Sequence, residues 1–303
     1  MSSWFQDIKQ NFKLKKSKEF KGFLSYIWKM SINLDDKGFK TVAKEYDLFF
    51  IDIWGVLHNG ISIFNNSLEV LNELENLKKE YVLLTNAPRP NFVVKRFLEN
   101  MGLDKNISNK VYTSGEAALE YLTLNYKEKK FFHIGPPRDF DLFKLFEKNK
   151  MKRPEEAEYF LCTGLFEKYE KDLEYYLKIF KSEIKKKMIC TNPDLIVHRG
   201  SEIEYCAGSI AKIFEKLGGK VIYFGKPYPE IYNFCIKKNE NVLAIGDNIR
   251  TDISGANKMN FDSLFITGGI HNDEFSEVSL QNYDKVLDKY GVKTNYYQQR
   301  LTW

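Results

Sequence analysis

Four apolar stretches of this 303-residue chain each end in polar side chains that could act on a phosphate group. The first ends in a carboxylate before a glycine, the second in a hydroxyl and an amide, the third in a lysine, and the fourth in two acids. In chain order these residues are Asp52 and Gly55, then Thr85 and Asn86, then Lys226, and finally Asp247, Asn248 and Asp252. Together they supply a nucleophile, neutral hydrogen-bond donors, a cation and a pair of metal-binding acids.

Phosphoryl transfer needs this combination, because it requires an in-line nucleophile, neutralisation of the phosphoryl oxygens and a hard divalent cation. A carboxylate nucleophile would form an aspartyl-phosphate and so divide hydrolysis into two easier steps. Magnesium prefers oxygen ligands, usually one or two carboxylates together with the substrate phosphate. We therefore expect Mg²⁺ as the cofactor, with Asp52 and Asp247 among its ligands.

Each of these features, taken alone, also has an ordinary structural interpretation. An aspartate at a strand end often caps a helix, and Thr-Asn or Gly-Lys-Pro sequences are common in turns. Function is favoured because the features occur in this order and each closes an apolar stretch.

The elements that must position these residues alternate between strands and helices. Strands are expected near 47–53, 81–84, 111–112, 131–134, 159–162, 188–191, 220–224, 242–245 and 262–266, and helices near 67–79, 91–101 and from 116. This alternation is typical of an α/β fold with a doubly wound, Rossmann-like parallel sheet. Ligands of such sheets bind beyond the carboxyl ends of the strands.

The motifs from Asp52 to Asp252 resemble those of the haloacid dehalogenase-like (HAD) phosphohydrolases of class IIA, which include the NagD-type nucleotide phosphatases and the pyridoxal phosphate phosphatases. The resemblance covers residues 45–270 and includes Cys190-Thr191-Asn192-Pro193-Asp194 and Tyr205-Cys206-Ala207-Gly208-Ser209. The first motif, Asp-x-Trp-Gly-Val-Leu-His, resembles a recurring subgroup of that class. The resemblance implies a Mg²⁺-dependent phosphatase of a small phosphorylated metabolite: a sugar phosphate, a nucleotide or a cofactor phosphate.

Carried over to the matching positions, the resemblance implies a role for each site residue. Asp52 would be the nucleophile and a Mg²⁺ ligand, with the backbone carbonyl of Trp54 and the carboxylate of Asp247 as further ligands. The phosphoryl oxygens would be held by Thr85, Asn86 and the loop at Gly55. Lys226 would neutralise the charge of the nucleophile and of the phosphate. The metal site would be supported by Asn248 and Asp252.

The resemblance also implies an α/β cap domain inserted into the core. We expect an N-terminal extension at 1–44, a discontinuous HAD core at 45–125 and 217–303, and the cap at 126–216. Asn192 and Asp194 would lie in the cap, where this class shapes substrate choice and often forms its dimer contact. A homodimer is therefore expected.

One position departs from the family pattern. The usual first motif has a second aspartate two residues after the nucleophile, which protonates the leaving group and then activates water, but here that residue is Trp54. Indole cannot transfer this proton, and general acid–base catalysis typically contributes about 10²–10⁴-fold. His58 is the nearest titratable candidate for the missing role, but the favoured interpretation is a loop imidazole bonded to backbone, since a histidine near a site is not thereby a base. We expect slow hydrolysis that favours substrates with good leaving groups. The alternative is a catalytically impaired protein on the same fold that binds a phosphate ligand or has a regulatory role.

The formal charge of +5 is concentrated at the N-terminus, since residues 1–30 hold seven lysines against Asp7 and Glu19 and the remainder is balanced. A nucleic-acid surface is therefore not expected. The aromatic residues among these lysines have helical spacing, typical of a basic amphipathic helix. That helix could touch a membrane surface weakly, bind a partner, pack on the body, or precede a true start at Met30.

The cysteines are scattered, and the sequence has neither an apolar signal segment nor a long membrane span. These features favour reduced thiols and a cytoplasmic location. The cysteines are Cys162, Cys190, Cys206 and Cys235.

Overall fold

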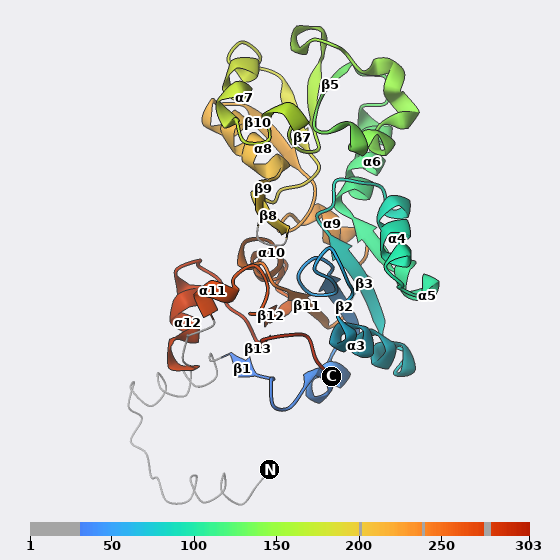
Figure 1. The fold of residues 1–303 in the computed structure, drawn as a ribbon, viewed down its shortest axis with the longest axis vertical. Coiled ribbons are helices and arrows are strands. Elements are labelled where there is room, and N and C mark those ends of the chain that lie inside the picture. Colours follow the sequence, from blue (N-terminus) through green and yellow to red (C-terminus); the bar gives the residue numbers. More distant parts are fainter. Residues whose placement is uncertain (1–30, 200–201, 238–239, 276–279) are drawn as a thin grey trace, which may run out of the picture.

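The structure is a computed structural model that describes residues 31–199, 202–237, 240–275 and 280–303. The predictions of a membrane-contacting helix and of a start at Met30 concern residues 1–30, which lie outside the described residues. Figure 1 shows two bodies stacked along the long axis, the larger one below and containing the C-terminus. Within the described ranges, no helix is both long enough and apolar enough to cross a membrane.

The larger body is built on a parallel sheet of seven strands. Its strand order is β1 (Ile32–Asn33), β13 (Tyr296–Gln298), β12 (Asp262–Ile266), β11 (Val242–Gly246), β2 (Leu48–Asp52), β3 (Glu80–Thr85) and β4 (Val111–Thr113). The strand β2 is buried along its whole length, as expected for a central parallel strand covered on both faces. The predicted doubly wound α/β fold is confirmed.

Helices cover both faces of this sheet because successive residues of each strand point to opposite sides. Along β2, Phe49 and Ile51 pack in one apolar cluster, and Leu48 and Phe50 pack in another. The first cluster includes residues of α3 (Asn65–Asn76), α4 (Asn91–Asn100) and α5 (Lys105–Ser108), and the second includes residues of α9 (Glu230–Asn233) and α10 (Ser254–Met259). A third cluster joins β12 to α11 (Asn272–Phe275) and α12 (Leu280–Asp288).

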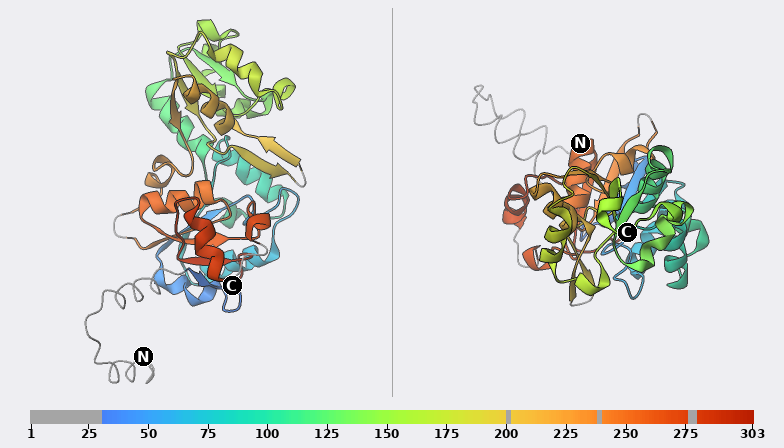
Figure 2. Two further views of the ribbon diagram at one scale, coloured as in Figure 1. Left: turned by 90° about the vertical axis from the view of Figure 1, so that its left-hand side faces the viewer. Right: turned by 90° about the horizontal axis from the view of Figure 1, so that it is seen from above.

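The smaller body holds a parallel sheet of four strands. Its order is β10 (Lys220–Tyr223), β7 (Lys187–Cys190), β6 (Tyr159–Cys162) and β5 (Phe131–Ile134). The helices that pack on it are α6 (Ser114–Asn125), α7 (Leu173–Phe180) and α8 (Ala207–Lys216). An antiparallel hairpin, β8 (Ile196–Arg199) and β9 (Glu202–Tyr205), projects sideways at the level of the junction between the bodies (Figure 2).

Short helices of three to six residues complete the described structure. They lie at Phe39–Thr41, Ala43–Glu45, Pro137–Leu142, Lys144–Asn149, Pro154–Glu156 and Glu167–Tyr169, with a π-helical turn, η7, at Ile249–Ile253.

Packing and pairing differ from the predicted domain boundaries at three places. The strand at 220–223 was assigned to the core, but it pairs with β7 of the smaller sheet. The helix at 114–125 was also assigned to the core, yet Ala118 and Leu122 pack in a cluster with residues of β5 and β6. Residues 31–44 were assigned to an extension, but β1 joins the larger sheet and Phe39 is buried in its core. We therefore propose a cap that runs from about residue 114 to about residue 223.

These differences arise because both sheets are parallel and apolar, so strand composition alone does not say which sheet a strand joins. The short strands β1, β13, β8 and β9 were not predicted, since runs of two to four residues carry almost no periodic signal.

Candidate functional site

Three buried aspartates gather at the carboxyl end of the larger sheet. Asp52 is the last residue of β2, Asp247 follows β11, and Asp252 lies in η7. One carboxylate oxygen from each lies within 4.8 Å of those of the other two. The cluster forms because β2 and β11 are neighbouring parallel strands, which end at the same edge of the sheet.

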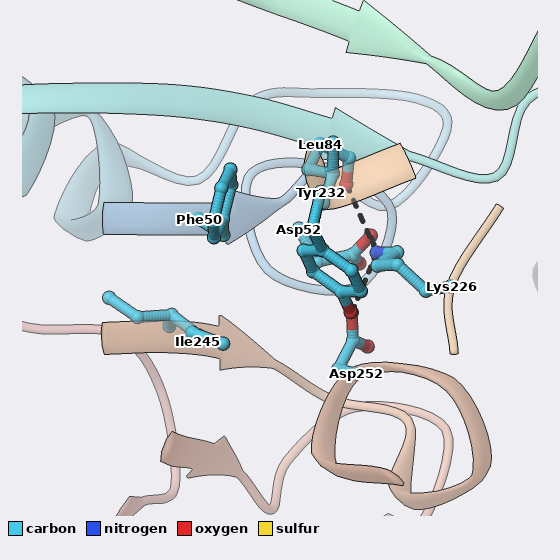
Figure 3. A pocket seen from close by; sticks show the side chains of 8 residues that line it. Phe50, Asp52, Leu84, Lys226, Tyr232, Ile245 and Asp252 are labelled. Carbon is cyan, nitrogen blue, oxygen red and sulfur yellow. Dashed lines mark hydrogen bonds and ion pairs between the residues drawn. The ribbon is translucent and has the colours of Figure 1, made fainter. Parts of the chain in front are cut away.

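Lys226 joins this cluster from the loop that leaves the smaller body, two residues after Phe224, which directly follows β10. Its ammonium group donates to Asp52 Oδ1, to Asp252 Oδ1 at 2.6 Å and to the backbone oxygen of Leu84 at 3.0 Å (Figure 3). The side chain is buried. One cation therefore faces three carboxylates, so that the site carries excess negative charge when all of them are ionised.

Burial and mutual repulsion govern the protonation of these carboxyls. Burial raises the pKa of Asp52 well above its ordinary value, and Lys226 opposes this rise. Burial, with the neighbouring Asp252, raises the pKa of Asp247 to about 7. Burial alone would lower the pKa of Lys226, but Asp252 and Asp52 outweigh it and raise that pKa. A further cation beside Asp52 and Asp247 would favour their ionised forms.

The donor set fits Mg²⁺, which prefers carboxylate and carbonyl oxygens. Two glycines leave room for Asp247: a Cβ at Gly55 or at Gly269 would lie 2.0 Å from Asp247 Oδ2. Gly55 also has a φ of 88°, a conformation that favours glycine. The amide of Ile270 donates to Asp247 Oδ2 at 2.9 Å and fixes its orientation. The loops at 55 and 269–270 thus hold one acid in place.

The loop after β3 supplies the predicted hydroxyl and amide. Thr85 ends β3, and its buried hydroxyl accepts a hydrogen bond from the amide of Ala87 at 3.2 Å. The side-chain nitrogen of Asn86 donates to Asp194 Oδ1 at 2.9 Å and to the backbone oxygen of Lys226 at 3.0 Å, and its oxygen accepts from the Lys226 amide at 2.7 Å. The Asn86 side chain is therefore committed to protein partners.

His58 and Trp54 lie together in the loop after β2. His58 Nδ1 accepts from the amide of Gly60 at 2.8 Å, and the His58 ring lies 5.1 Å from the Trp54 ring in an edge-to-face arrangement. Burial lowers the pKa of His58 to about 4, so the imidazole is neutral at pH 7. This geometry is that of a loop imidazole bonded to backbone and does not favour an acid–base role for His58.

The two predicted cap residues follow β7 at the junction between the bodies. Asn192 Oδ1 accepts from the amide of Asp194 at 2.9 Å, so Asn192 shapes the turn that presents Asp194. Asp194 also borders a cavity of about 300 Å³ that extends past Asn248, Arg250 and Ile270. This volume is at the lower end for small-molecule sites.

Sequence reasoning missed the loop at Gly269 and Ile270, although the glycines at 268 and 269, just after the strand at 262–266, were a usable signal. It also missed an ion pair between the bodies, in which Arg89 Nε lies 3.1 Å from the buried Asp139. Asp139 had no such signal, because it lies in a short helical turn of the smaller body.

Two family models match the chain, and together they span more than half of it. One is described as a haloacid dehalogenase-like hydrolase and matches residues 49–147, which contain Asp52, Thr85 and Asn86. The other is described as HAD-hydrolase-like and matches residues 223–291, which contain Lys226 and Asp247. The residues gathered at the carboxyl end of the larger sheet are thus divided between the two matches.

Individual proteins are similar over most of the chain. The ribonucleotide monophosphatase NagD of Escherichia coli K12 is 27% identical over 229 residues, covering 72% of this chain and 86% of NagD. A haloacid dehalogenase-like hydrolase from Brucella suis 1330 is 27% identical, with a TM-score of 0.74 and coverage of 88% and 99%. A p-nitrophenyl phosphatase from Archaeoglobus fulgidus, at 20% identity, shares the fold with a TM-score of 0.66 over 84% of this chain and 97% of its own.

Proposed function

We propose that this chain, which belongs to the haloacid dehalogenase-like hydrolases, hydrolyses a small phosphorylated metabolite through an aspartyl-phosphate on Asp52. The family matches and the NagD relative support a phosphatase. The observation that carries the assignment to this site is the contact of Lys226 with both Asp52 and Asp252, inside a cluster of three buried carboxylates.

In the first step a carboxylate oxygen of Asp52 attacks phosphorus, and the bond between phosphorus and the leaving-group oxygen breaks. The leaving group departs as its oxyanion: a phenolate needs no proton, whereas an alkoxide takes one from water, because Trp54 cannot donate it. In the second step water attacks the phosphorus of the aspartyl-phosphate, which releases inorganic phosphate and restores the carboxylate. Lys226 balances charge on Asp52 and on the phosphoryl oxygens, and the Thr85 hydroxyl and the amides of its loop orient those oxygens.

Asp52, Asp247 and the backbone carbonyl of Trp54 would hold Mg²⁺, with Asp252 and Asn248 supporting them. The ion would offset the excess negative charge of the site and draw charge from the transferring phosphoryl group. The raised pKa of Asp247 is consistent with this role, since a bound cation favours its ionised form.

We propose a small substrate whose leaving group would occupy the cavity of about 300 Å³ that borders Asp194 and Asn248. Asp52, Asp247 and Lys226 are not among the residues that line this cavity. Nucleotides, sugar phosphates and cofactor phosphates all have leaving groups of suitable size. Trp54 replaces the usual acid–base aspartate, so substrates whose leaving groups depart without a proton donor should turn over fastest.

The test is phosphate release from aryl, sugar, nucleotide and cofactor phosphates, with and without Mg²⁺, with Asp52→Asn as the blank. Release that requires both Mg²⁺ and Asp52 is the expected result. No release above the blank, together with retained binding of a phosphorylated ligand, would instead favour the non-catalytic binding protein that Trp54 suggests.

Two further expectations stay predictions. Sedimentation velocity would test the homodimer. Co-sedimentation with vesicles, with and without residues 1–30, would test a membrane-surface contact.

A further inference from the structure

A chain of hydrogen bonds leads from the smaller body to the backbone of Lys226. Asp194 accepts from the side-chain nitrogen of Asn86 at 2.9 Å. Asn86 in turn holds both backbone groups of Lys226, its nitrogen at 3.0 Å from the carbonyl oxygen and its oxygen at 2.7 Å from the amide nitrogen. Asn86 and Lys226 are both buried, so water does not compete strongly for these bonds.

Asp194 is itself firmly held by its own body. Its amide donates to Asn192 Oδ1 at 2.9 Å, and its carbonyl accepts from the amide of Gly208, at the start of α8, at 3.1 Å. The preceding Pro193 lies against the loop of Lys226, since a Cβ on Gly225 would come within 2.7 Å of the proline ring. The carboxylate is therefore presented to Asn86 by a rigid turn.

The charge of Asp194 selects one orientation of the Asn86 amide. If the amide were flipped, its oxygen would face the Asp194 carboxylate and the Lys226 carbonyl, and its nitrogen would face the Lys226 amide. All three contacts would then be repulsive or unpaired, which is costly for buried groups. In the observed orientation all three are satisfied, and the backbone of Lys226 is fixed.

We infer that Asp194 is a positioning residue for Lys226 and acts through Asn86, instead of selecting the substrate. The inference rests on the proposed function, because it assumes that Lys226 serves the phosphoryl group. The rival role is substrate contact, since Asp194 also borders the cavity. The two roles differ in a measurable way: a positioning residue affects every substrate alike, whereas a contact affects substrates according to their leaving groups.

The experiment compares Asp194→Ala with wild type on p-nitrophenyl phosphate, a sugar phosphate and a nucleoside monophosphate. We expect kcat to fall by the same factor on all three, about 10–100-fold, because a misplacement of about 1 Å is typically that costly. KM should stay within about twofold, since the cradle for the phosphoryl group is kept. Asp194→Asn should recover most of kcat, because its carbonyl oxygen still accepts from Asn86. A loss that varies with the leaving group, or no loss, would overturn the inference.

Asp139→Asn is the matched control. Asp139 is another buried carboxylate of the smaller body, and its partner Arg89 lies in the same loop as Asn86. If the effect of a substitution were only to weaken the contact between the two bodies, both variants should lose activity. The series of hydrogen bonds that leads to Lys226, in contrast, includes only Asp194. We expect Asp139→Asn to retain kcat within about threefold; a loss equal to that of Asp194→Ala would overturn the inference.

A readout independent of activity is a double-mutant cycle of Asp194→Ala and Asn86→Ala, followed by urea unfolding. Coupled residues should give a double variant whose urea midpoint shifts by less than the two single shifts combined. Additive shifts would overturn the inference. If wild type turned over no substrate, the proposed function would fail, and this cycle alone would decide whether Asp194 holds Asn86.

Discussion

At the scale of single residues, the central question is how a leaving group obtains its proton. The family position for the acid is occupied by Trp54, and the nearby His58 is buried, bonded through Nδ1 to Gly60 and neutral at pH 7. A neutral histidine with a pKa of about 4 is a poor proton donor at that pH. The step that breaks the bond to an alkyl leaving group should therefore be slow.

Trp54→Asp should restore part of this proton transfer. We expect the ratio of kcat/KM for an alkyl phosphate to that for p-nitrophenyl phosphate to rise by at least about 10-fold, because only the alkyl leaving group needs an acid. The measurement is this ratio at pH 6–7 in the presence of Mg²⁺. Trp54→Asn is the control, since it removes the indole without adding an acid; an equal change in both variants would contradict the explanation.

At the scale of elements, the carboxyl ends of β2, β3 and β11 could be predicted from the sequence, because each is an apolar run closed by polar residues. The position of Lys226 could be predicted only in part. Its strand is predicted, but β10 belongs to the smaller sheet, and no pattern within a strand of four residues distinguishes one parallel sheet from another. The contact of Asn86 with Asp194 could not be predicted either, because it joins loops that lie 108 residues apart.

The loop after β2 depends on glycine at position 55 for two separable reasons. Gly55 has a positive φ of 88°, and a Cβ there would lie 2.0 Å from Asp247 Oδ2. Gly218 has a similar φ of 92°, but nothing lies within 4 Å of the position that its Cβ would take. A substitution at Gly218 therefore tests backbone strain without a steric clash.

We expect Gly55→Ala and Gly218→Ala each to lower the free energy of unfolding by about 1–2 kcal/mol, from backbone strain alone. Gly55→Ala should in addition raise the Mg²⁺ concentration needed for half-maximal activity by about 10-fold, because it displaces a metal-binding oxygen. The two measurements are urea denaturation and a Mg²⁺ titration of turnover. A Mg²⁺ requirement that is unchanged in Gly55→Ala would argue against Asp247 as a ligand.

At the scale of the whole molecule, each body buries a neutral histidine. His133 lies in β5 of the smaller body, where burial, aided by Lys150, lowers its pKa to about 3, and its ring bonds to the Thr163 hydroxyl at 2.9 Å. His58 lies in the larger body with a pKa lowered to about 4 by burial. The unfolded chain protonates both near pH 6.5, whereas the folded chain does not until the pH is far lower.

The contribution of these two histidines to the free energy of unfolding should therefore be fully present above pH 6.5. It should fall as the pH decreases toward 4 for His58 and toward 3 for His133. The direction follows because the unfolded state binds more protons in this window. Each histidine should cost about 2 kcal/mol of unfolding free energy between pH 7.5 and pH 5. The aspartates whose pKa is raised, such as Asp247, act in the opposite direction, so the total slope for wild type mixes both effects.

The informative quantity is the difference in pH dependence between wild type and His133→Gln, which keeps a polar group near Thr163 but cannot titrate. We expect the variant to lose about 2 kcal/mol less than wild type between pH 7.5 and pH 5, whatever its stability at pH 7.5. Urea denaturation followed by circular dichroism at the two pH values measures this difference. Parallel pH dependences in the two proteins would mean that His133 takes up its proton over the same pH range in the folded and the unfolded chain, and that the smaller body admits a charge that its burial should exclude.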